Sequence, residues 1–484
     1  MKKAFVSNLI LLMSVNLLIK PFWILGIDRG VQNYVGYVDY GIYLNLFNFS
    51  MLLITLLEMG INTYVSSTVA RDPERLKAEF IPLTGFKLLS SLLYVGVTIA
   101  LGFANGFDDY RVGLLFFLTI NQILSYFYMY FRAIVGGLQL FKTDAFLSVI
   151  DRLLMIIFCG LMLWTSFLEM SISRFIYAQT FAYTIAVSIT LAVLWKHLKG
   201  LRFGFKTPEL VQVLKQMLPY ALLSLLMTLY TRLDAVIMPK LIENGDYMNG
   251  IYASAYRLLD ASNMMAAMVS MMLLPLFARM LATKENISGI VQFSGTIMIL
   301  PALTLCMAAW LYQSEIMHQM NPKSTSYAAM VFGTVMISFL GLASMYVFGT
   351  LLTAAAHLRT LNSLALVALG INLGLNGFLI PKYQALGAAI ASASTQLFIG
   401  FSNFWFARKN LNLNFEKGFA LKFMLAALLL ILGSLLIRNW ISDWLIGILA
   451  IGSLLIFLLL SLKLINPAES SGLLKGLMDK RERK

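Results

Sequence analysis

The stretch SLLMTLYTRLDAVIMPKL, from Ser224 to Leu241, has the length and apolar character of a membrane-spanning helix except at two positions, Arg232 and Asp234. An ionised side chain at the centre of such a helix costs about 2.5–3.5 kcal/mol on insertion scales. Because of this cost, charged residues inside spans almost always face a bundle interior or a water-filled cavity. The stretch therefore predicts a helical membrane protein with a polar interior face.

The composition of the whole chain agrees with this prediction. Of its 484 residues, 59% are hydrophobic and only 12% are charged, and the mean hydropathy is +0.79. Soluble domains carry about 25% charged residues. We predict an all-α polytopic membrane protein with fourteen transmembrane helices around a central cavity. The predicted spans are 5–27, 41–69, 80–104, 112–136, 145–167, 173–195, 216–241, 250–278, 289–311, 326–352, 361–380, 386–407, 421–437 and 444–465.

Lysine and arginine are distributed unevenly between alternate loops. If the N-terminus is cytoplasmic, the inner segments hold 24 of these residues and the outer segments hold seven. Short loops rich in Lys and Arg stay on the cytoplasmic side, so we predict that both termini are cytoplasmic. Basic loops that face anionic lipid also account for the net charge of +14, and no nucleic-acid partner is needed to explain it.

The chain shows signs of an internal duplication. The sequence DYGIYLNLF (Asp39 to Phe47), near the start of the second span, recurs as MNGIYASAY (Met248 to Tyr256), near the start of the eighth. We predict an N-terminal six-helix lobe (1–200), a cytoplasmic linker (201–215), a C-terminal six-helix lobe (216–410), and two additional transmembrane helices with a basic cytoplasmic tail (411–484). Transporters with duplicated halves place their site at the repeat interface near the bilayer midplane.

Ionisable and amide side chains within the predicted spans are the candidate functional residues. Helical spacing places several of them in stripes, such as Tyr220, Ser224, Thr228 and Thr231 on the seventh span. Stripes on helices of both halves predict one wet cavity with a basic bias. The candidate substrate ligands are Lys20, Lys87, Arg132, Arg152, Arg232, Arg257, Tyr128, Tyr256, Asn16 and Asn121. The candidate coupling-ion residues are Glu58, Asp234 and Asp260.

Structural roles remain open for several of these residues. Arg257 and Asp260 are three residues apart and could neutralise each other on one helix. Arg132 lies near the inner end of its span, from where it could reach the headgroups. Arg152 and its neighbour Asp151 could pair with another helix. The two cysteines sit singly inside apolar spans, which supports neither a disulfide framework nor a metal cluster.

Two longer stretches resemble a known family. They are RLDAVIMPKLIENGDYMNGIYASAYRLLD (Arg232 to Asp260) and the segment from Gly349 to Thr395, which contains Asn372-Leu373, Ile380-Pro381 and the run Gly387 to Ala391. Together with fourteen spans, they resemble the polysaccharide transporter family of the multidrug, oligosaccharidyl-lipid and polysaccharide exporter superfamily. The resemblance implies a flippase for undecaprenyl-pyrophosphate-linked oligosaccharide, such as a lipopolysaccharide O-antigen, capsule or exopolysaccharide repeat unit. The basic positions would then form a cationic lumen.

The resemblance also sets expectations about location, partners and mechanism. It implies a multi-pass protein of the bacterial inner membrane that works by alternating access, is not an enzyme, has no cofactor and acts as a monomer. Coupling to the membrane potential, a proton or sodium is expected, as are contacts with membrane lipids and with polysaccharide polymerase machinery. Two alternatives are a lipid II flippase and a multidrug or cation antiporter of the same superfamily. The predicted spans contain six basic and four acidic residues, and this excess of positive charge favours an anionic substrate over a cation.

Overall fold

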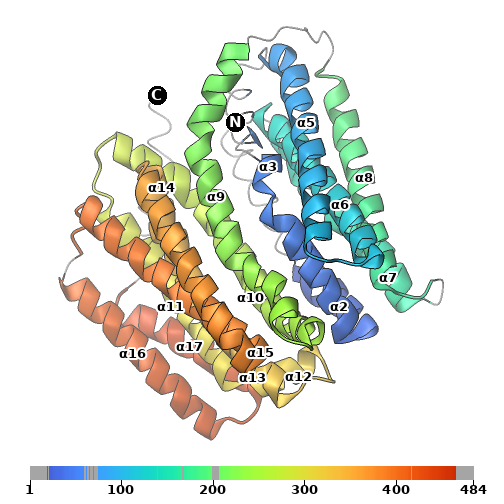
Figure 1. Cartoon of the computed structure of the whole chain (residues 1–484). Coiled ribbons are helices and arrows are strands. Elements are labelled where there is room, and N and C mark those ends of the chain that lie inside the picture. The colour runs from blue at the N-terminus through green and yellow to red at the C-terminus, as the bar shows by residue number, and fades with distance from the viewer. Residues whose placement is uncertain are drawn as a thin grey trace. The chain divides into compact units, whose positions relative to one another are not determined.

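The computed structural model describes residues 19, 21–58, 61–62, 65, 69, 75–138, 140–165, 168–198, 207–415 and 417–464. Helices make up its regular structure, and no strand occurs among these residues (Figure 1). Ten of the helices that these described residues form are long and apolar enough to cross a membrane. The prediction of an all-α polytopic membrane protein is therefore confirmed.

The observed helices follow the predicted spans closely from the third span onward. Their bounds are η1 (Trp23–Asp28), α2 (Arg29–Leu52), α3 (Thr55–Glu58), α5 (Arg75–Ala104), α6 (Asp109–Gly137), α7 (Phe141–Trp164), α8 (Ile172–Trp195), α9 (Thr207–Leu241), α10 (Gly245–Ala282), α11 (Ser288–Leu311), α12 (Gln313–Met320), α13 (Ser326–Ser344), η2 (Met345–Gly349), α14 (Thr350–Ala354), α15 (Leu358–Asn410), α16 (Lys417–Trp440) and α17 (Trp444–Ser461).

Two of these helices contain a sharp break that separates two spans. α15 has 53 residues, about 80 Å of helix, which is far more than one crossing needs. It is interrupted at Gln384, which has a φ of 53°, between the predicted spans 361–380 and 386–407. α2 is interrupted at Gly36, which has a φ of 87°, a conformation that glycine adopts without steric cost. The chain therefore turns back at these two positions without a long loop.

Contacts between Cα atoms group the chain into two compact units. Unit 1 comprises residues 1–257 and 365–391, and unit 2 comprises residues 258–364 and 392–484. Each unit is described by itself below. The lobe boundaries expected from the sequence, near residues 200, 216 and 410, stay a prediction.

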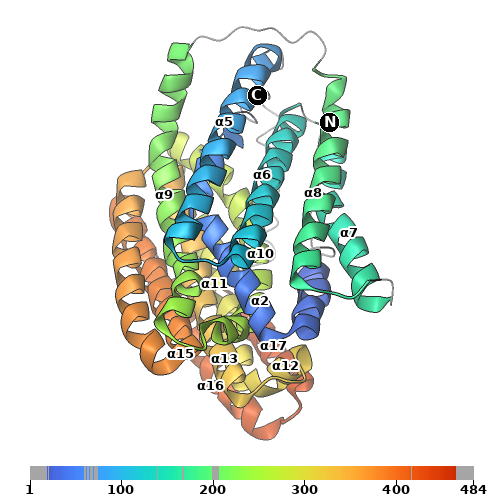
Figure 2. The ribbon, with the colours of Figure 1, turned by 45° about the vertical axis from the view of Figure 1, so that its right-hand side comes forward.

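Unit 1 is built on neighbouring long helices. α5, α6 and α8 run side by side, and α7 packs against α6 and α8 (Figure 2). One apolar cluster joins η1, α2, α6, α7 and α8 through residues such as Trp23, Leu46, Leu118 and Phe175. α2 also packs along α9, which brings residues about 190 positions apart in the sequence into contact. This packing positions the polar groups of the candidate site.

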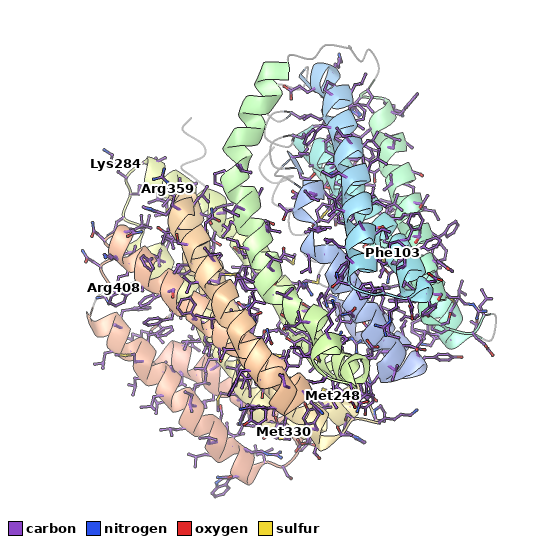
Figure 3. The ribbon with its side chains drawn as sticks, viewed as in Figure 1. Phe103, Met248, Lys284, Met330, Arg359 and Arg408 are labelled. Carbon is purple, nitrogen blue, oxygen red and sulfur yellow. The ribbon has the colours of Figure 1, made fainter. Side chains whose placement is uncertain are left out.

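Unit 2 is centred on α11, which packs against α13, α16 and α17. Lys284, Arg359 and Arg408, which lie in three segments predicted to be cytoplasmic, gather toward one end of the unit, and Met330 of α13 lies toward the other (Figure 3).

Candidate functional site

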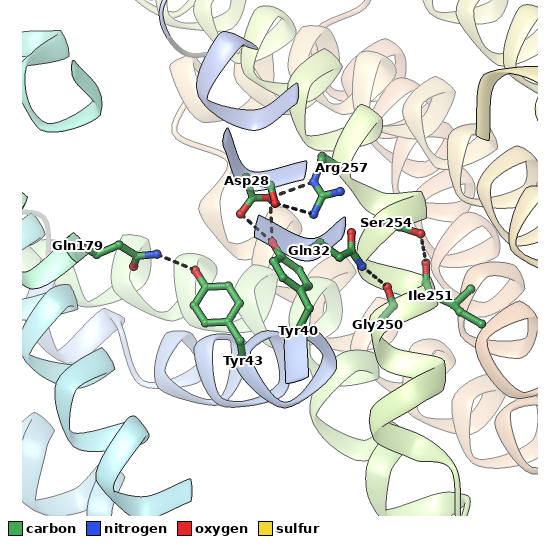
Figure 4. Close-up of polar contacts among 9 residues, drawn as sticks. All are labelled: Asp28, Gln32, Tyr40, Tyr43, Gln179, Gly250, Ile251, Ser254 and Arg257. Carbon is green, nitrogen blue, oxygen red and sulfur yellow. Dashed lines mark hydrogen bonds and ion pairs between the residues drawn. The ribbon is translucent and has the colours of Figure 1, made fainter. Parts of the chain in front are cut away.

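A carboxylate and a guanidinium from distant parts of unit 1 form the centre of the candidate site. Asp28 ends the π-helical turn η1, and Arg257 projects from α10. The Arg257 Nε donates to Asp28 Oδ2 at 2.9 Å, and the Tyr40 hydroxyl donates to the same carboxylate at 2.7 and 2.8 Å (Figure 4). The Arg257 guanidinium also lies 5.2 Å from the centre of the Tyr40 ring. Only 3% of the Arg257 side chain is exposed, so Asp28 and Tyr40 largely fix its orientation.

Arg152 of α7 places a second guanidinium against η1, the turn that Asp28 ends. Arg152 interacts electrostatically with Asp28, Tyr43 and Tyr183, and its Nε lies 3.4 Å from Oδ2 of the adjacent Asp151. Its guanidinium is 5.6 Å from the centre of the Trp23 ring. Unlike the Arg257 side chain, the Arg152 side chain keeps 30% of its surface exposed. Of the two guanidinium groups, that of Arg152 therefore has exposed atoms that a ligand can contact.

Hydrogen-bonding groups that suit a hydroxylated ligand lie next to these charges. Gln179 of α8 donates from Nε2 to the Tyr43 hydroxyl at 3.3 Å (Figure 4). The Tyr43 ring packs edge-on against Phe175, which itself stacks on Trp23. We call the set Asp28, Tyr40, Tyr43, Arg152, Gln179 and Arg257 the Asp28 site. Guanidinium groups bind planar oxyanions through paired N–H donors, so this set is suited to a phosphate or carboxylate with polar substituents.

The recurring Gly-Ile-Tyr sequence forms the closest approach between α2 and α10. A Cβ atom added at Gly41 would lie 1.8 Å from the Asp246 carbonyl oxygen, and one added at Gly250 would lie 2.0 Å from the Tyr37 carbonyl oxygen. Each glycine therefore meets the carbonyl four residues before the other glycine, so the contact is symmetric. We call Tyr37, Gly41, Asp246 and Gly250 the glycine crossing. Small residues let helix backbones approach closely enough for Cα–H···O contacts.

Side-chain amides from both helices tie the glycine crossing together. The Gln32 Nε2 donates to the Gly250 carbonyl at 2.7 Å, and the Asn249 Nδ2 donates to the Gly41 carbonyl at 3.3 Å. Asn45 donates to the carbonyls of Ala235 and Val236 at 3.1 Å, which adds α9. An ion pair of 2.5 Å between Arg111 and Asp246 links α6 to α10. The crossing and the Asp28 site lie on the same helices, α2 and α10.

Arg232 and Asp234, the two charges in the opening stretch, have different surroundings. Arg232 is partly buried and donates from Nη1 to Asn48 Oδ1 at 3.4 Å. Asp234 is 1% exposed and accepts hydrogen bonds from the Tyr252 hydroxyl at 2.5 Å and from the Ala235 backbone N–H at 2.8 Å. Thr228 and Thr231 donate to carbonyls of their own helix. The hydroxyl stripe predicted for this helix is thus partly used by its own backbone.

Removing the hydroxyl that holds Asp234 is expected to destabilise the protein. Tyr252→Phe leaves a buried carboxylate with one donor fewer, and a hydrogen bond to a charged group contributes about 1.5–3 kcal/mol. Thermal unfolding of the purified protein measures the loss. The double variant Tyr252→Phe with Asp234→Asn should lose less stability than the two single variants lose together, because the buried side chain at position 234 is then neutral. A Tyr252→Phe protein as stable as the parent would contradict this role of Asp234.

Lys87 and Glu58 lie in the interior of unit 1. Lys87 is fully buried, and its Nζ donates to the Leu57 carbonyl at 2.8 Å. Glu58 interacts electrostatically with Lys87 and accepts a hydrogen bond from Asn62 at 2.7 Å. With no exposed atom, the ammonium cannot contact a ligand in this structure, and for this reason we do not place Lys87 in the Asp28 site.

Arg132, Tyr128 and Asn121 on α6 make local contacts. The Arg132 Nε forms a 2.9 Å ion pair with Asp144 at the start of α7, and its guanidinium lies 5.7 Å from the centre of the Tyr128 ring. Asn121 donates to the Ile176 carbonyl of α8 at 3.2 Å. Arg132 and Asn121 therefore connect α6 to its neighbours, and the predicted roles of all three residues as substrate ligands stay untested.

The other candidates fall outside this group. The Tyr256 ring packs against Tyr252 with centroids 5.3 Å apart. Asp260 belongs to unit 2, where it interacts electrostatically with Tyr346, whereas the Arg257 guanidinium of unit 1 forms its ion pair with Asp28. Asn16 and Lys20 lie outside the described residues.

The sequence analysis missed several residues of the Asp28 site. It ended the first span at Ile27 and so assigned Asp28 and Tyr40 to an outer loop. A signal was present, since Asp28 and Gln32 are four residues apart and share a helix face if the helix continues. Tyr43 lies inside the recurring Gly-Ile-Tyr sequence, which was interpreted only as evidence of duplication. Nothing in the sequence distinguishes Gln179 from other polar residues in spans.

The sequence and the fold of the chain can be compared with those of known proteins. Residues 5–281, more than half of the chain, match the sequence family described as "Polysaccharide biosynthesis protein". The chain belongs to this family. No curated protein sequence gives a significant match.

Solved structures share the fold of this polysaccharide biosynthesis family member. The lipid II flippase MurJ, in an inward closed conformation, is similar with a TM-score of 0.69 at 15% identity, over 94% of this chain and 98% of MurJ. An inward-facing multidrug resistance transporter of the MATE family gives a TM-score of 0.66 at 13% sequence identity, over 81% of this chain and 94% of that transporter. A MOP superfamily transporter from Pyrococcus furiosus gives a TM-score of 0.54 at 13% sequence identity, over 84% of this chain and 94% of the other. The chain therefore has the fold of membrane flippases and transporters.

Proposed function

We propose that the protein is a flippase that moves an undecaprenyl-pyrophosphate-linked oligosaccharide across the bacterial cytoplasmic membrane by alternating access. The substrate would be a repeat unit of O-antigen, capsule or exopolysaccharide. The observation that carries the proposal is the Asp28 site, where the Arg257 guanidinium pairs with the Asp28 carboxylate and the partly exposed Arg152 guanidinium lies against Trp23 of the same turn, η1. The fold of a flippase family supports the reaction class, and the site chemistry supports the substrate class.

The chemistry of the site suits the headgroup of such a lipid. A pyrophosphate can take the place of the Asp28 carboxylate as the partner of Arg257, while the partly exposed Arg152 supplies a second guanidinium. Tyr43 and Gln179 can then offer hydrogen bonds to sugar hydroxyls. With the cell interior negative, outward movement of anionic charge is favoured by about 2.3 kcal/mol per charge per 100 mV. The prenyl tail needs no polar site and stays in lipid.

The glycine crossing supplies a contact that can close one side of the site. It lies beside residues 242–249, a loop predicted to be outside, so its closure would block the outer face. Alternating access requires that α2 and α10 separate there when the headgroup leaves. Asp234 and Asp260 remain the candidates for an ion that couples to this movement. We propose a monomer with cytoplasmic termini that passes its product to polysaccharide polymerase machinery.

One alternative has the same headgroup chemistry and one does not. Lipid II also carries a pyrophosphate, so the Asp28 site suits it equally, and competition between lipids with different sugars would separate the two substrates. A cation antiporter needs acidic residues facing its substrate, whereas the more exposed charged group at this site is the Arg152 guanidinium, with 30% of its side chain exposed against 18% for Asp28. The site therefore favours an anionic lipid.

Proteoliposomes that contain a fluorescent undecaprenyl-pyrophosphate saccharide provide the test. Arg152→Gln is expected to slow flipping about tenfold or more, because losing a charge-assisted hydrogen bond from the site costs at least about 1.4 kcal/mol. The matched control is Arg438→Gln, which breaks a partly exposed ion pair with Glu315 in unit 2. Equal loss in both variants, or undiminished flipping by Arg152→Gln, would refute the assignment, and efflux of organic cations by the parent protein would favour the antiporter.

A further inference from the structure

The Lys87 ammonium sits in a shell that resembles a binding site for a free cation. Its Nζ donates to the Leu57 carbonyl at 2.8 Å, and none of its surface is exposed. The ring centres of Tyr126, Phe127 and Tyr130 lie 5.9, 5.7 and 5.6 Å from the Nζ. Aromatic faces at these distances attract a desolvated cation through their quadrupole. The shell therefore combines a carbonyl oxygen with three π faces.

The negative groups of this shell come from an interrupted helix. α2 ends at Leu52, and the one-turn helix α3 (Thr55–Glu58) follows after a turn. α5 supplies donors to one backbone carbonyl on each side of this interruption: the Tyr94 hydroxyl donates to the Ser50 carbonyl at 2.7 Å, and the Lys87 Nζ donates to the Leu57 carbonyl. In transporters, the carbonyl ends of broken helices coordinate alkali cations.

A carboxylate lies next to the shell. Glu58 directly follows Leu57 and interacts electrostatically with Lys87. The Asn62 Nδ2 donates to Glu58 Oε2 at 2.7 Å and so holds the carboxylate in place. A carbonyl oxygen, a carboxylate and aromatic faces are all groups that bind a weakly hydrated monovalent cation. The same groups offer no preference for the four-carbon stem that carries the ammonium.

We propose that this place is a monovalent-cation site whose occupant is the chain's own Lys87 ammonium. The tethered charge takes the position that a diffusible cation would otherwise fill, so Glu58 is not available to a coupling ion in the wild-type protein. A side chain that keeps the stem but lacks the Nζ would open the site to K⁺ or NH₄⁺, which match the lost ammonium in size and charge. The proposal concerns the interior of unit 1 and does not depend on the substrate of the flippase.

Lys87→Met is the variant that tests it, because methionine retains the stem and removes the terminal ammonium. Thermal unfolding of the purified protein is measured in chloride salts of NH₄⁺, K⁺, Na⁺ and N-methyl-D-glucamine at equal ionic strength. We expect the variant to melt about 3 °C or more higher in NH₄⁺ or K⁺ than in N-methyl-D-glucamine, and the wild type to show no such difference. The matched control is Lys382→Met, which removes an exposed ammonium that lies 3.7 Å from the centre of the Phe378 ring.

Two further outcomes decide between a cation site and a purely structural ion pair. The double variant Lys87→Met with Glu58→Gln has a neutral shell, so it should fold and lose the dependence on the salt. A Lys87→Met protein that melts at one temperature in all four salts would overturn the proposal. The proposal would also fail if Lys87→Met could not be recovered folded in KCl or NH₄Cl, or if only Na⁺ stabilised it. Because no lipid substrate is present, these results do not bear on the flipping activity.

Discussion

Gly250→Ala is expected to reduce flipping about tenfold or more and to prevent α2 and α10 from closing on each other. The added Cβ would lie 2.0 Å from the Tyr37 carbonyl oxygen, and backbone atoms cannot move aside without separating the helices. Overpacking of this kind costs about 1–3 kcal/mol, enough to shift the population of a closed state by about tenfold or more. Because the crossing is symmetric, Gly41→Ala should act in the same way.

Disulfide formation measures this closure directly. Tyr37 and Tyr247 pack ring against ring with centroids 5.5 Å apart, so cysteines at these positions should cross-link when the buried Cys159 and Cys306 have been replaced. The rate should fall in Gly250→Ala. Gly96→Ala is the matched control, since an added Cβ there meets no atom within 4 Å and alanine favours a helix. Unchanged cross-linking and flipping in Gly250→Ala would show that the crossing does not control access.

Exchanging the charges of Asp28 and Arg257 is expected to separate the structural role of the pair from its transport role. Asp28→Asn alone leaves the Arg257 guanidinium, 3% exposed, without its carboxylate, and breaking a buried ion pair costs about 3–5 kcal/mol. The double variant Asp28→Arg with Arg257→Asp restores one charge of each sign. It should regain part of the lost stability. It should not regain flipping, because a phosphate that displaces the partner of residue 257 would then meet a carboxylate in place of the guanidinium.

Thermal unfolding and flipping of the single and exchanged variants check this expectation together. Recovery of both properties in the exchanged protein would indicate that the pair only holds η1 against α10. If the exchanged protein recovers neither stability nor flipping, the single variants decide whether the pair matters. An Asp28→Asn protein that is stable and flips normally would contradict the importance of the pair.

The fold could largely be predicted from the sequence because the physical signal for a membrane helix is strong. Long apolar runs located α5 to α17, and the boundary between the predicted spans 361–380 and 386–407 falls at the break at Gln384. The first turn was misplaced for a local reason. The sequence analysis treated the polar residues after Ile27 as a loop, whereas the helix continues to Gly36, where a glycine with positive φ turns the chain.

The candidate site was harder to predict, because a sequence shows which charges lie at bilayer depth but not their partners. Arg152 and Arg257 were identified from their cost in a span, yet Asp28, the ion-pair partner of Arg257, was assigned to a loop. Lys87 was expected to face a cavity because no acid lies near it in the sequence of its own helix. Its partner groups come from the interrupted helix α2–α3, which only the tertiary structure brings to it.

The central claim is that the Asp28 site binds the phosphate-bearing end of an anionic lipid. Titration of the purified protein with undecaprenyl pyrophosphate that carries no sugar tests it most directly. The account predicts saturable binding that weakens with added salt, about tenfold or more weaker binding by Arg152→Gln, and unchanged binding by Arg438→Gln. Equal affinity of the parent protein and Arg152→Gln for this lipid would contradict it.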